Sequence, residues 1–270
     1  MITLTPPAKR SRQTGFTLVE MAMVLLIIAL LLGGLLPTIS SQIEQQRMNE
    51  TRKTLEEIKD ALFGFAAANG RLPCPASIST NGMESFCNAS GVCATEILPP
   101  PAFPPHGNCF KPYDGFLPAA TLGITPTDSQ GYALDGWSNR IRYAVTKANS
   151  NAFTTPPNGM QATGMGTLDP DLHVCAGAST SASFINGTNC GGGTAVSLTT
   201  KGVAVIYSLG KNAKTVGTDA DEAANLNSNK VFVSHVPSPA TSPNGEFDDI
   251  VTWLSANILY NRMVAAGKLP

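Results

Sequence analysis

The stretch Gly15-Phe16-Thr17-Leu18-Val19-Glu20 opens directly into an apolar run that carries no further charge until Glu44. Three cations and no acid precede this stretch, namely Lys9, Arg10 and Arg12. A secretory signal ends in small residues after its hydrophobic run, whereas here the glycine stands before the run. Cleavage at this glycine would leave the apolar segment attached to the mature chain, so we expect the segment to be an anchor.

This junction resembles that of type IV prepilins and of the related pseudopilins of type II secretion. The likeness rests on Gly15 followed by Phe16, on Glu20 at the head of the apolar run and on Pro37 at its far end. It implies that a prepilin peptidase cuts between Gly15 and Phe16 and methylates the new amine of Phe16, after which the product assembles with other pilin-like subunits. It also implies that Glu20 attracts the N-terminal amine of a neighbouring subunit and so sets the axial register of a filament.

An uncleaved signal anchor is the alternative to a prepilin. A carboxylate costs about 2.5–3.5 kcal/mol at the centre of a bilayer and less near its edge. An anchor alone has no use for such a cost, so Glu20 favours the resemblance to prepilins.

The expected organisation has four segments: a leader at 1–15, a transmembrane or filament-core helix at 16–39, an amphipathic continuation at 40–70 and a globular head at 71–270. Residues 16–39 would form about 36 Å of helix at about 1.5 Å per residue, enough for one membrane crossing. The cations that precede this span predict a cytoplasmic N-terminus and a periplasmic head, hence a single-pass protein of the bacterial inner membrane. Pro37 predicts a kink in the helix.

Beyond Pro37 the apolar residues recur at spacings of three and four up to the pair Asn69-Gly70, which is typical of a left-handed helix end. The stripe consists of Thr51, Leu55, Ile58, Leu62 and Phe65. The spacing also predicts ion pairs on the wet side, between Arg52 and Glu56 and between Lys53 and Glu57. A plain coiled coil is the competing interpretation, but the stripe covers barely two heptads. We therefore expect the spine of a globular domain.

All six cysteines lie in the expected head, at Cys74, Cys87, Cys93, Cys109, Cys175 and Cys190. An even count in an oxidising compartment predicts three disulfides, and fifteen pairings are open in principle. Proximity along the chain favours Cys87 with Cys93 and Cys175 with Cys190, which leaves Cys74 with Cys109. Zinc is the alternative, but the spacings contain no CxxC pair.

The head reads as a sheet with irregular connections. Residues 73–126 are proline-rich and predict a disulfide-stapled irregular region, and residues 148–200 predict a long surface excursion. Strands are expected at 140–145, 203–209 and 231–236, and a terminal helix at 250–266. The predicted fold class is α+β: a long N-terminal helix, transmembrane in its first half, packed on an antiparallel β-sheet head with disulfide-stapled loops.

Two further segments are similar to pseudopilins. Asp135-Gly136-Trp137-Ser138-Asn139 resembles the pseudopilin turn Asp-Pro-Trp-Gly-Asn, with Gly136 and Ser138 as departures. An acidic loop follows a strand, as in major pseudopilins, where such a loop surrounds calcium. No cofactor is otherwise required, and the resemblance implies a structural calcium held by Asp219, Asp221, Glu222, Asp248 and Asp249. The alternative is that Asp248 and Asp249 cap the terminal helix.

The sequence favours a structural subunit over an enzyme, because it contains no HExxH pair, GxSxG elbow or phosphate-binding glycine loop. Residues 71–270 hold 11 Lys and Arg against 13 Asp and Glu, a net formal charge of −2, so no nucleic-acid partner is expected. The length favours a minor component of a type II secretion pseudopilus or a type IV pilus, a choice that stays open. A pilus-associated adhesin or another membrane-tethered periplasmic binding protein is the alternative.

Overall fold

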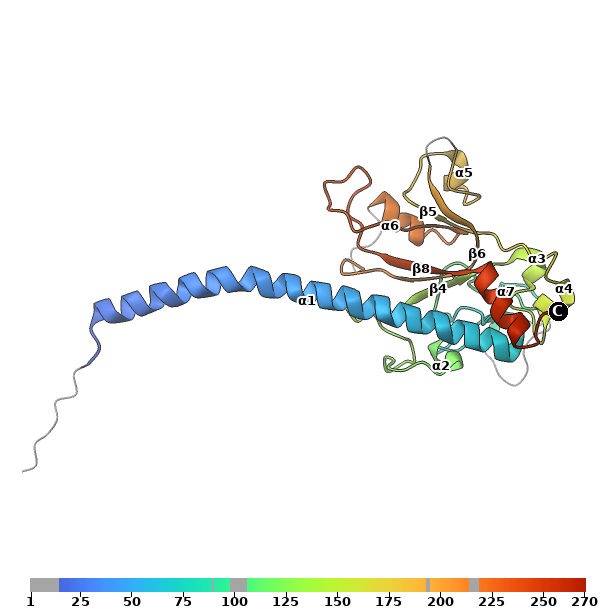
Figure 1. The fold of residues 1–270 in the computed structure, drawn as a ribbon, viewed down its shortest axis with the longest axis horizontal. Helices are drawn as coiled ribbons and strands as arrows, with labels where there is room; N and C mark the ends of the chain where they lie inside the picture. The colour runs from blue at the N-terminus through green and yellow to red at the C-terminus, as the bar shows by residue number, and fades with distance from the viewer. Residues whose placement is uncertain (1–14, 89, 98–105, 193–194, 214–218) are drawn as a thin grey trace, which may run out of the picture. The chain divides into compact units, whose positions relative to one another are not determined.

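The computed structural model describes residues 15–88, 90–97, 106–192, 195–213 and 219–270, and for 32–39 it describes the backbone alone. The chain divides into two compact units, Met1–Gln46 and Arg47–Pro270. The longest element, α1, contributes to both units, and the remaining elements belong to the second (Figure 1). In chain order the elements are α1 (Leu18–Asn69), β1 (Phe86–Cys87), β2 (Glu96–Ile97), β3 (Gly115–Phe116), α2 (Ala119–Leu122), β4 (Arg142–Val145), α3 (Ala148–Asn151), α4 (Gly159–Thr163), β5 (Leu172–Cys175), α5 (Ala182–Ile185), β6 (Ser197–Ser208), α6 (Ala220–Asn225), β7 (Val231–Val233), β8 (Ile250–Ser255) and α7 (Ala256–Ala265).

The long helix and its end are confirmed. α1 runs for 52 residues and stops where Gly70 adopts φ +71, with the Gly70 N–H donating to the Ala66 carbonyl at 2.8 Å. Lys53 pairs with Glu57 at 3.6 Å as the spacing predicts. The predicted pair between Arg52 and Glu56 is wrong, because Glu56 pairs instead with Lys59 at 3.0 Å.

The main sheet of the second unit has the order β3-β4-β6-β5-β7, with β8 paired to β6. β6 is the organising strand, since β4, β5 and β8 all run antiparallel to it. The expectation of a purely antiparallel sheet is wrong at one edge, where β5 and β7 are parallel. A parallel pair needs a long crossover, and the chain between β5 and β7 supplies it with β6 and α6.

The core lies on both faces of this sheet. One face packs against α1 through Leu55, Ile58 and Leu62, which join Ile206 of β6 in a single buried cluster. Val205 and Tyr207, which flank Ile206 in β6, belong to a second cluster on the other face, as the alternation of side chains along a strand requires. α7 adds Leu259 and Met263 to the first cluster, so the C-terminal helix and α1 pack in the same core.

Two predictions for the second half of the head are wrong in part. The terminal helix expected at 250–266 begins only at Ala256, because residues 250–255 form β8. This segment contains β-branched and aromatic side chains, and pairing with β6 places it in the sheet. The stretch 148–200, expected to be a surface excursion, contains β5 and buries Phe153 and Met160 in the core.

Three disulfides staple the loops: Cys74–Cys109, Cys87–Cys93 and Cys175–Cys190, the pairing that proximity along the sequence favours. A buried ion pair reinforces the first staple. Arg71, 3% exposed, donates to both carboxylate oxygens of Glu84, 0% exposed, at 2.6 and 3.0 Å. Glu84 also accepts the N–H of Cys74 at 2.9 Å, so the pair links the end of α1 to the first bridge.

Candidate functional site

The junction at Gly15-Phe16 is accessible and is followed at once by α1. Phe16 is 85% exposed, and apart from the chain neighbours of Gly15 no described residue has an atom within 4 Å of a Cβ added to that glycine. The predicted leader 1–15, with its three cations, lies outside the described residues except for Gly15. The described part of the junction therefore presents the Gly15–Phe16 peptide bond to solvent.

Glu20 belongs to a helix cap that sequence reasoning missed. The N–H and Oγ1 of Thr17 both donate to Oε2 of Glu20 at 2.9 Å, and the Glu20 N–H donates back to Thr17 Oγ1 at 3.2 Å. This reciprocal arrangement is a capping box, whose sequence signal is Thr or Ser followed three residues later by Glu or Gln. Glu20 thus has a local structural role in addition to the filament role that the resemblance implies.

The first turns of α1 are apolar on every side. The consecutive residues Leu25, Leu26, Ile27 and Ile28 are all exposed, although they point in different directions around the helix. Within the described part of the chain, no helix combines the length and the apolar character needed to cross a membrane. α1 continues through Pro37, and the kink expected there stays a prediction.

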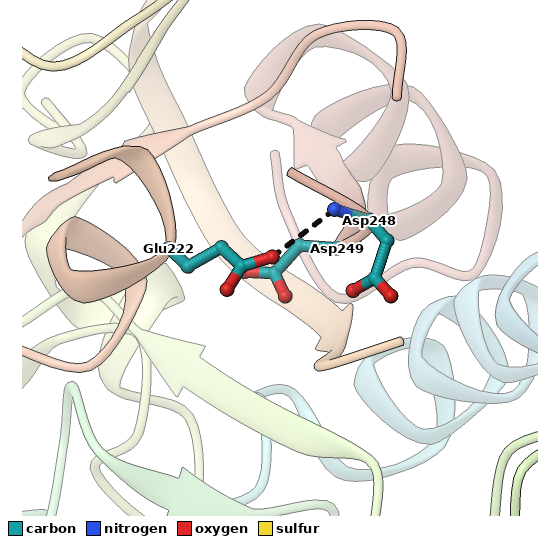
Figure 2. Close-up of side chains that lie close together, drawn as sticks. All are labelled: Glu222, Asp248 and Asp249. Atoms are coloured by element: carbon teal, nitrogen blue, oxygen red, sulfur yellow. Dashed lines mark hydrogen bonds between the residues drawn. The ribbon is translucent and has the colours of Figure 1, made fainter. Parts of the chain in front are cut away.

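A second site lies in the head, where three of the five predicted calcium ligands meet. Glu222 comes from α6, and Asp248 and Asp249 immediately precede β8. Figure 2 shows the three side chains close together. One carboxylate oxygen from each of these three residues, which we call the acid cluster, lies within 4.8 Å of the other two. Glu222 and Asp249 are buried and Asp248 is half-buried. The alternative that Asp248 and Asp249 cap a helix is wrong, because a strand follows them.

The acid cluster is held by amides rather than by cations. The Asn212 side chain donates to both oxygens of Glu222 at 2.9 Å, and the Asp248 N–H donates to Glu222 Oε1 at 3.1 Å. Asn225 donates to Asp249 Oδ2 at 2.7 Å. No member of the cluster forms an ion pair with a described residue. Asparagine amides carry no recognisable spacing, so no sequence signal could have identified these partners.

Burial and mutual repulsion disfavour the charged forms. Burial, with the neighbouring Glu222 and Asp248 charges, raises the pKa of Asp249 to about 8. Burial and the Glu222 charge raise the pKa of Asp248 to about 6, and burial raises that of Glu222. The site therefore needs protons or a bound cation to compensate its charge.

Two predicted ligands point elsewhere. Asp221 accepts hydrogen bonds from Asn244 Nδ2 and His235 Nε2, both at 3.1 Å, and from the Ala178 N–H. Asp219 lies against Gly245, where its Oδ1 would be 1.9 Å from an added Cβ. Asp221 therefore fastens the loop around the cluster, and neither residue joins it.

The turn at Asp135 is a structural joint. Asp135 Oδ1 accepts the N–H groups of Trp137 and Asn139 at 2.9 and 2.8 Å, and its Oδ2 accepts Ser208 Oγ at 2.6 Å. The Gly136 N–H donates to Thr51 Oγ1 at 2.9 Å, so the turn joins the end of β6 to α1. A Cβ on Gly136 would lie 2.7 Å from the Arg47 carbonyl oxygen, which explains a glycine at this departure from the pseudopilin turn.

Comparison with family models places the prokaryotic N-terminal methylation motif at residues 10–36. No curated protein and no solved structure matches the chain. The matched residues include Gly15, Phe16, Glu20 and the first turns of α1. The chain therefore carries the N-terminal methylation motif that is characteristic of the type IV prepilin and pseudopilin family.

Proposed function

We propose that the chain is the precursor of a structural filament subunit, with no enzymatic activity of its own. Prepilin peptidase cleaves between Gly15 and Phe16 and methylates Phe16, residues 16–39 hold the product in the inner membrane, and the periplasmic head then enters a filament with other pilin-like subunits. The methylation motif at residues 10–36 is the observation that carries this proposal.

The exposure of the apolar turns of α1 supports it. Exposed apolar surface costs about 25 cal/mol per Å² in water, and a bilayer or neighbouring helices would remove that cost. Mass spectrometry of the membrane-extracted protein should find methylated Phe16 as the first residue. An intact Met1 in cells with active prepilin peptidase would reject the proposal.

Glu20 provides the test of assembly. Glu20→Gln removes the charge but keeps a side chain that completes a capping box, since Gln serves there as well as Glu. We expect this variant to be processed normally and to be recovered in sheared filaments at least about tenfold less than the wild type, because close charge pairs at interfaces contribute about 1.5 kcal/mol or more.

Thr17→Ala is the matched control, because it breaks the cap and keeps the charge. Losing a cap costs about 1 kcal/mol of helix stability, so this variant should still assemble. Equal recovery of Glu20→Gln and wild type would reject the pairing between Glu20 and a neighbour's amine.

The resemblance of the Asp135 turn and of the acidic loop to pseudopilins favours a minor subunit of a type II secretion pseudopilus over a type IV pilus. An adhesin is the second candidate, favoured by the stapled loops of the head. Deletion of the gene separates the two, since loss of protein secretion supports the pseudopilus and loss of surface attachment with normal secretion supports the adhesin.

A structural calcium ion at the acid cluster is part of the proposal. Carboxylate oxygens are the ligands that calcium prefers, and Asp248 Oδ1 is buried without a hydrogen-bond partner among the described residues. Glu222, Asp248 and Asp249 would hold the ion, and its positive charge would compensate theirs.

A further inference from the structure

A groove of about 430 Å³ lies along one side of α1, between residues 50–58 and the segment 123–138. Its apolar lining includes Ile58, Ile124 and Leu134. Among the described residues, the charged ones that line it are all acidic, namely Glu50, Glu57 and Asp135. The groove therefore suits a side chain with an apolar stem and a cationic head.

The two exposed acids are available for such a head. Glu50 forms no ion pair with a described residue, and Glu57 has only the 3.6 Å pair with Lys53, in which both side chains are mostly exposed. Exposed pairs of this kind contribute about 0–1 kcal/mol, so Lys53 does not hold Glu57 firmly. The carboxylate of Asp135 is occupied by the turn and adds negative potential only.

The chain itself carries a matching cation on the other side of the same helix. Arg52 is exposed, and it forms no ion pair with a described residue because Lys59 takes Glu56. At about 100° per residue, Arg52 lies about 200° around α1 from Glu50, hence nearly opposite the groove. Donor and acceptor surfaces on opposite sides associate head to tail, which builds open chains rather than closed dimers.

We propose that the groove receives Arg52 from a second copy of this chain, so that like subunits adjoin one another along a filament. The arginine stem would pack on Ile124 and Leu134, which are half-buried at the groove, while the guanidinium reaches Glu50 and Glu57. This inference rests on the proposed function and adds to it a specific lateral contact. The contact requires that copies of this chain be neighbours in the filament. A minor subunit meets this requirement when its copies are incorporated side by side.

Isotopic mixing tests the contact directly. Full-length processed chain bearing Arg52→Lys, which keeps the charge and supplies an amine, is purified in detergent micelles from ¹⁴N and ¹⁵N cultures, mixed, and treated with a zero-length carbodiimide coupler. We expect peptides of mixed isotope content that join position 52 to Glu50 or Glu57. Links at position 52 found only within single-isotope peptides would overturn the proposal.

Charge reversal gives an independent test with an amine-reactive crosslinker. Arg52→Glu alone, and Glu50→Arg with Glu57→Arg, should each lower the crosslinked dimer at least about threefold, whereas Lys147→Glu, an exposed cation outside the groove, should not. Mixing the two defective chains should restore mixed dimers, because one partner supplies an intact groove and the other an intact Arg52. Dimer yields that are equal for all variants would overturn the proposal.

The N-terminus is measured in the same preparations. Methylated Phe16 together with absent crosslinks would reject the groove contact alone. An unprocessed Met1 would reject the proposed function, and the filament contact with it.

Discussion

Replacing Asp249 by asparagine should change how the stability of the head depends on pH. Asp249 is 4% exposed, and its Oδ2 accepts one hydrogen bond from Asn225 at 2.7 Å, which an asparagine oxygen can also accept. The substitution therefore removes the ionisable group and keeps its contact. The variant thus has no charge at this position and needs neither a proton nor a cation to compensate one.

The direction of this pH dependence follows from the pKa values of the Asp249 carboxyl in the unfolded and the folded state. The carboxyl group ordinarily titrates near 3.8, and burial with the neighbouring acids raises its folded-state pKa to about 8. Between these values the folded state binds a proton that the unfolded state has released, so the stability of the wild type falls as pH rises through this window. At about 1.36 kcal/mol per pKa unit, the loss is on the order of 4 kcal/mol by pH 7. Without metal, Asp249→Asn should avoid it.

The assay is denaturant unfolding of the full-length chain in detergent micelles, followed by tryptophan fluorescence from pH 5 to 9. Both tryptophans, Trp137 and Trp253, lie in the unit Arg47–Pro270, so the signal reports the head. In EDTA the variant should become progressively more stable than the wild type as pH rises. In millimolar calcium the order should reverse at neutral pH, because the wild type keeps a ligand that the variant lacks.

Asp169→Asn, which changes an exposed carboxylate, controls for the general effect of removing an acid. A stability difference between Asp249→Asn and wild type that stays constant from pH 5 to 9 in EDTA would refute the argument from burial. A difference unaffected by calcium would refute the calcium site alone.

Two further outcomes follow from the stapled region. Glu84→Ala should cost about 3–5 kcal/mol of unfolding free energy, because it removes the buried carboxylate that pairs with the Arg71 guanidinium. The exposed control Glu56→Ala should cost less than about 1 kcal/mol. Denaturant midpoints compare the two variants, and equal losses would contradict the importance of the buried pair. Mild reduction should open Cys87–Cys93 before the other two bridges, because Cys93 is exposed and the remaining cysteines are buried. Alkylation followed by mass mapping measures the order in which the bridges open. Alkylation of Cys175 before Cys93 would contradict this expectation.

Local signals carried the sequence predictions that the structure confirms. The end of α1 is encoded by Gly70, whose left-handed conformation no other residue type adopts as readily. Residues 250–255 carry β-branched and aromatic side chains, which favour a strand only weakly. The pairing with β6, far away in the chain, decides for the strand. A fold that brings three strands to one central strand is set by contacts that periodicity does not contain.

The acid cluster shows the same limit at a site. Glu222 and Asp248 are 26 positions apart, and the structure joins them through a hydrogen bond from the Asp248 backbone. Asp221 is adjacent to Glu222 in sequence, yet its side chain points to His235. Sequence could name the acidic loop but not choose among its members, because a one-residue step on a short helix turns a side chain by about 100°.

The capping box weakens the inference that Glu20 needs a partner in a neighbouring subunit. The cost of an acid beside an apolar span suggests a partner, and the structure supplies one within the chain, Thr17. Energy alone therefore does not demand a neighbour's amine. However, both Thr17 donors go to Oε2, and a carboxylate accepts through two oxygens, so the cap leaves capacity for a cation. The cap also fixes the carboxylate at the first turn of α1, four residues from the amine that cleavage would create at Phe16. A charge held in place is a better docking point than a mobile one, so capping and pairing reinforce each other, and only a variant that separates cap from charge distinguishes them.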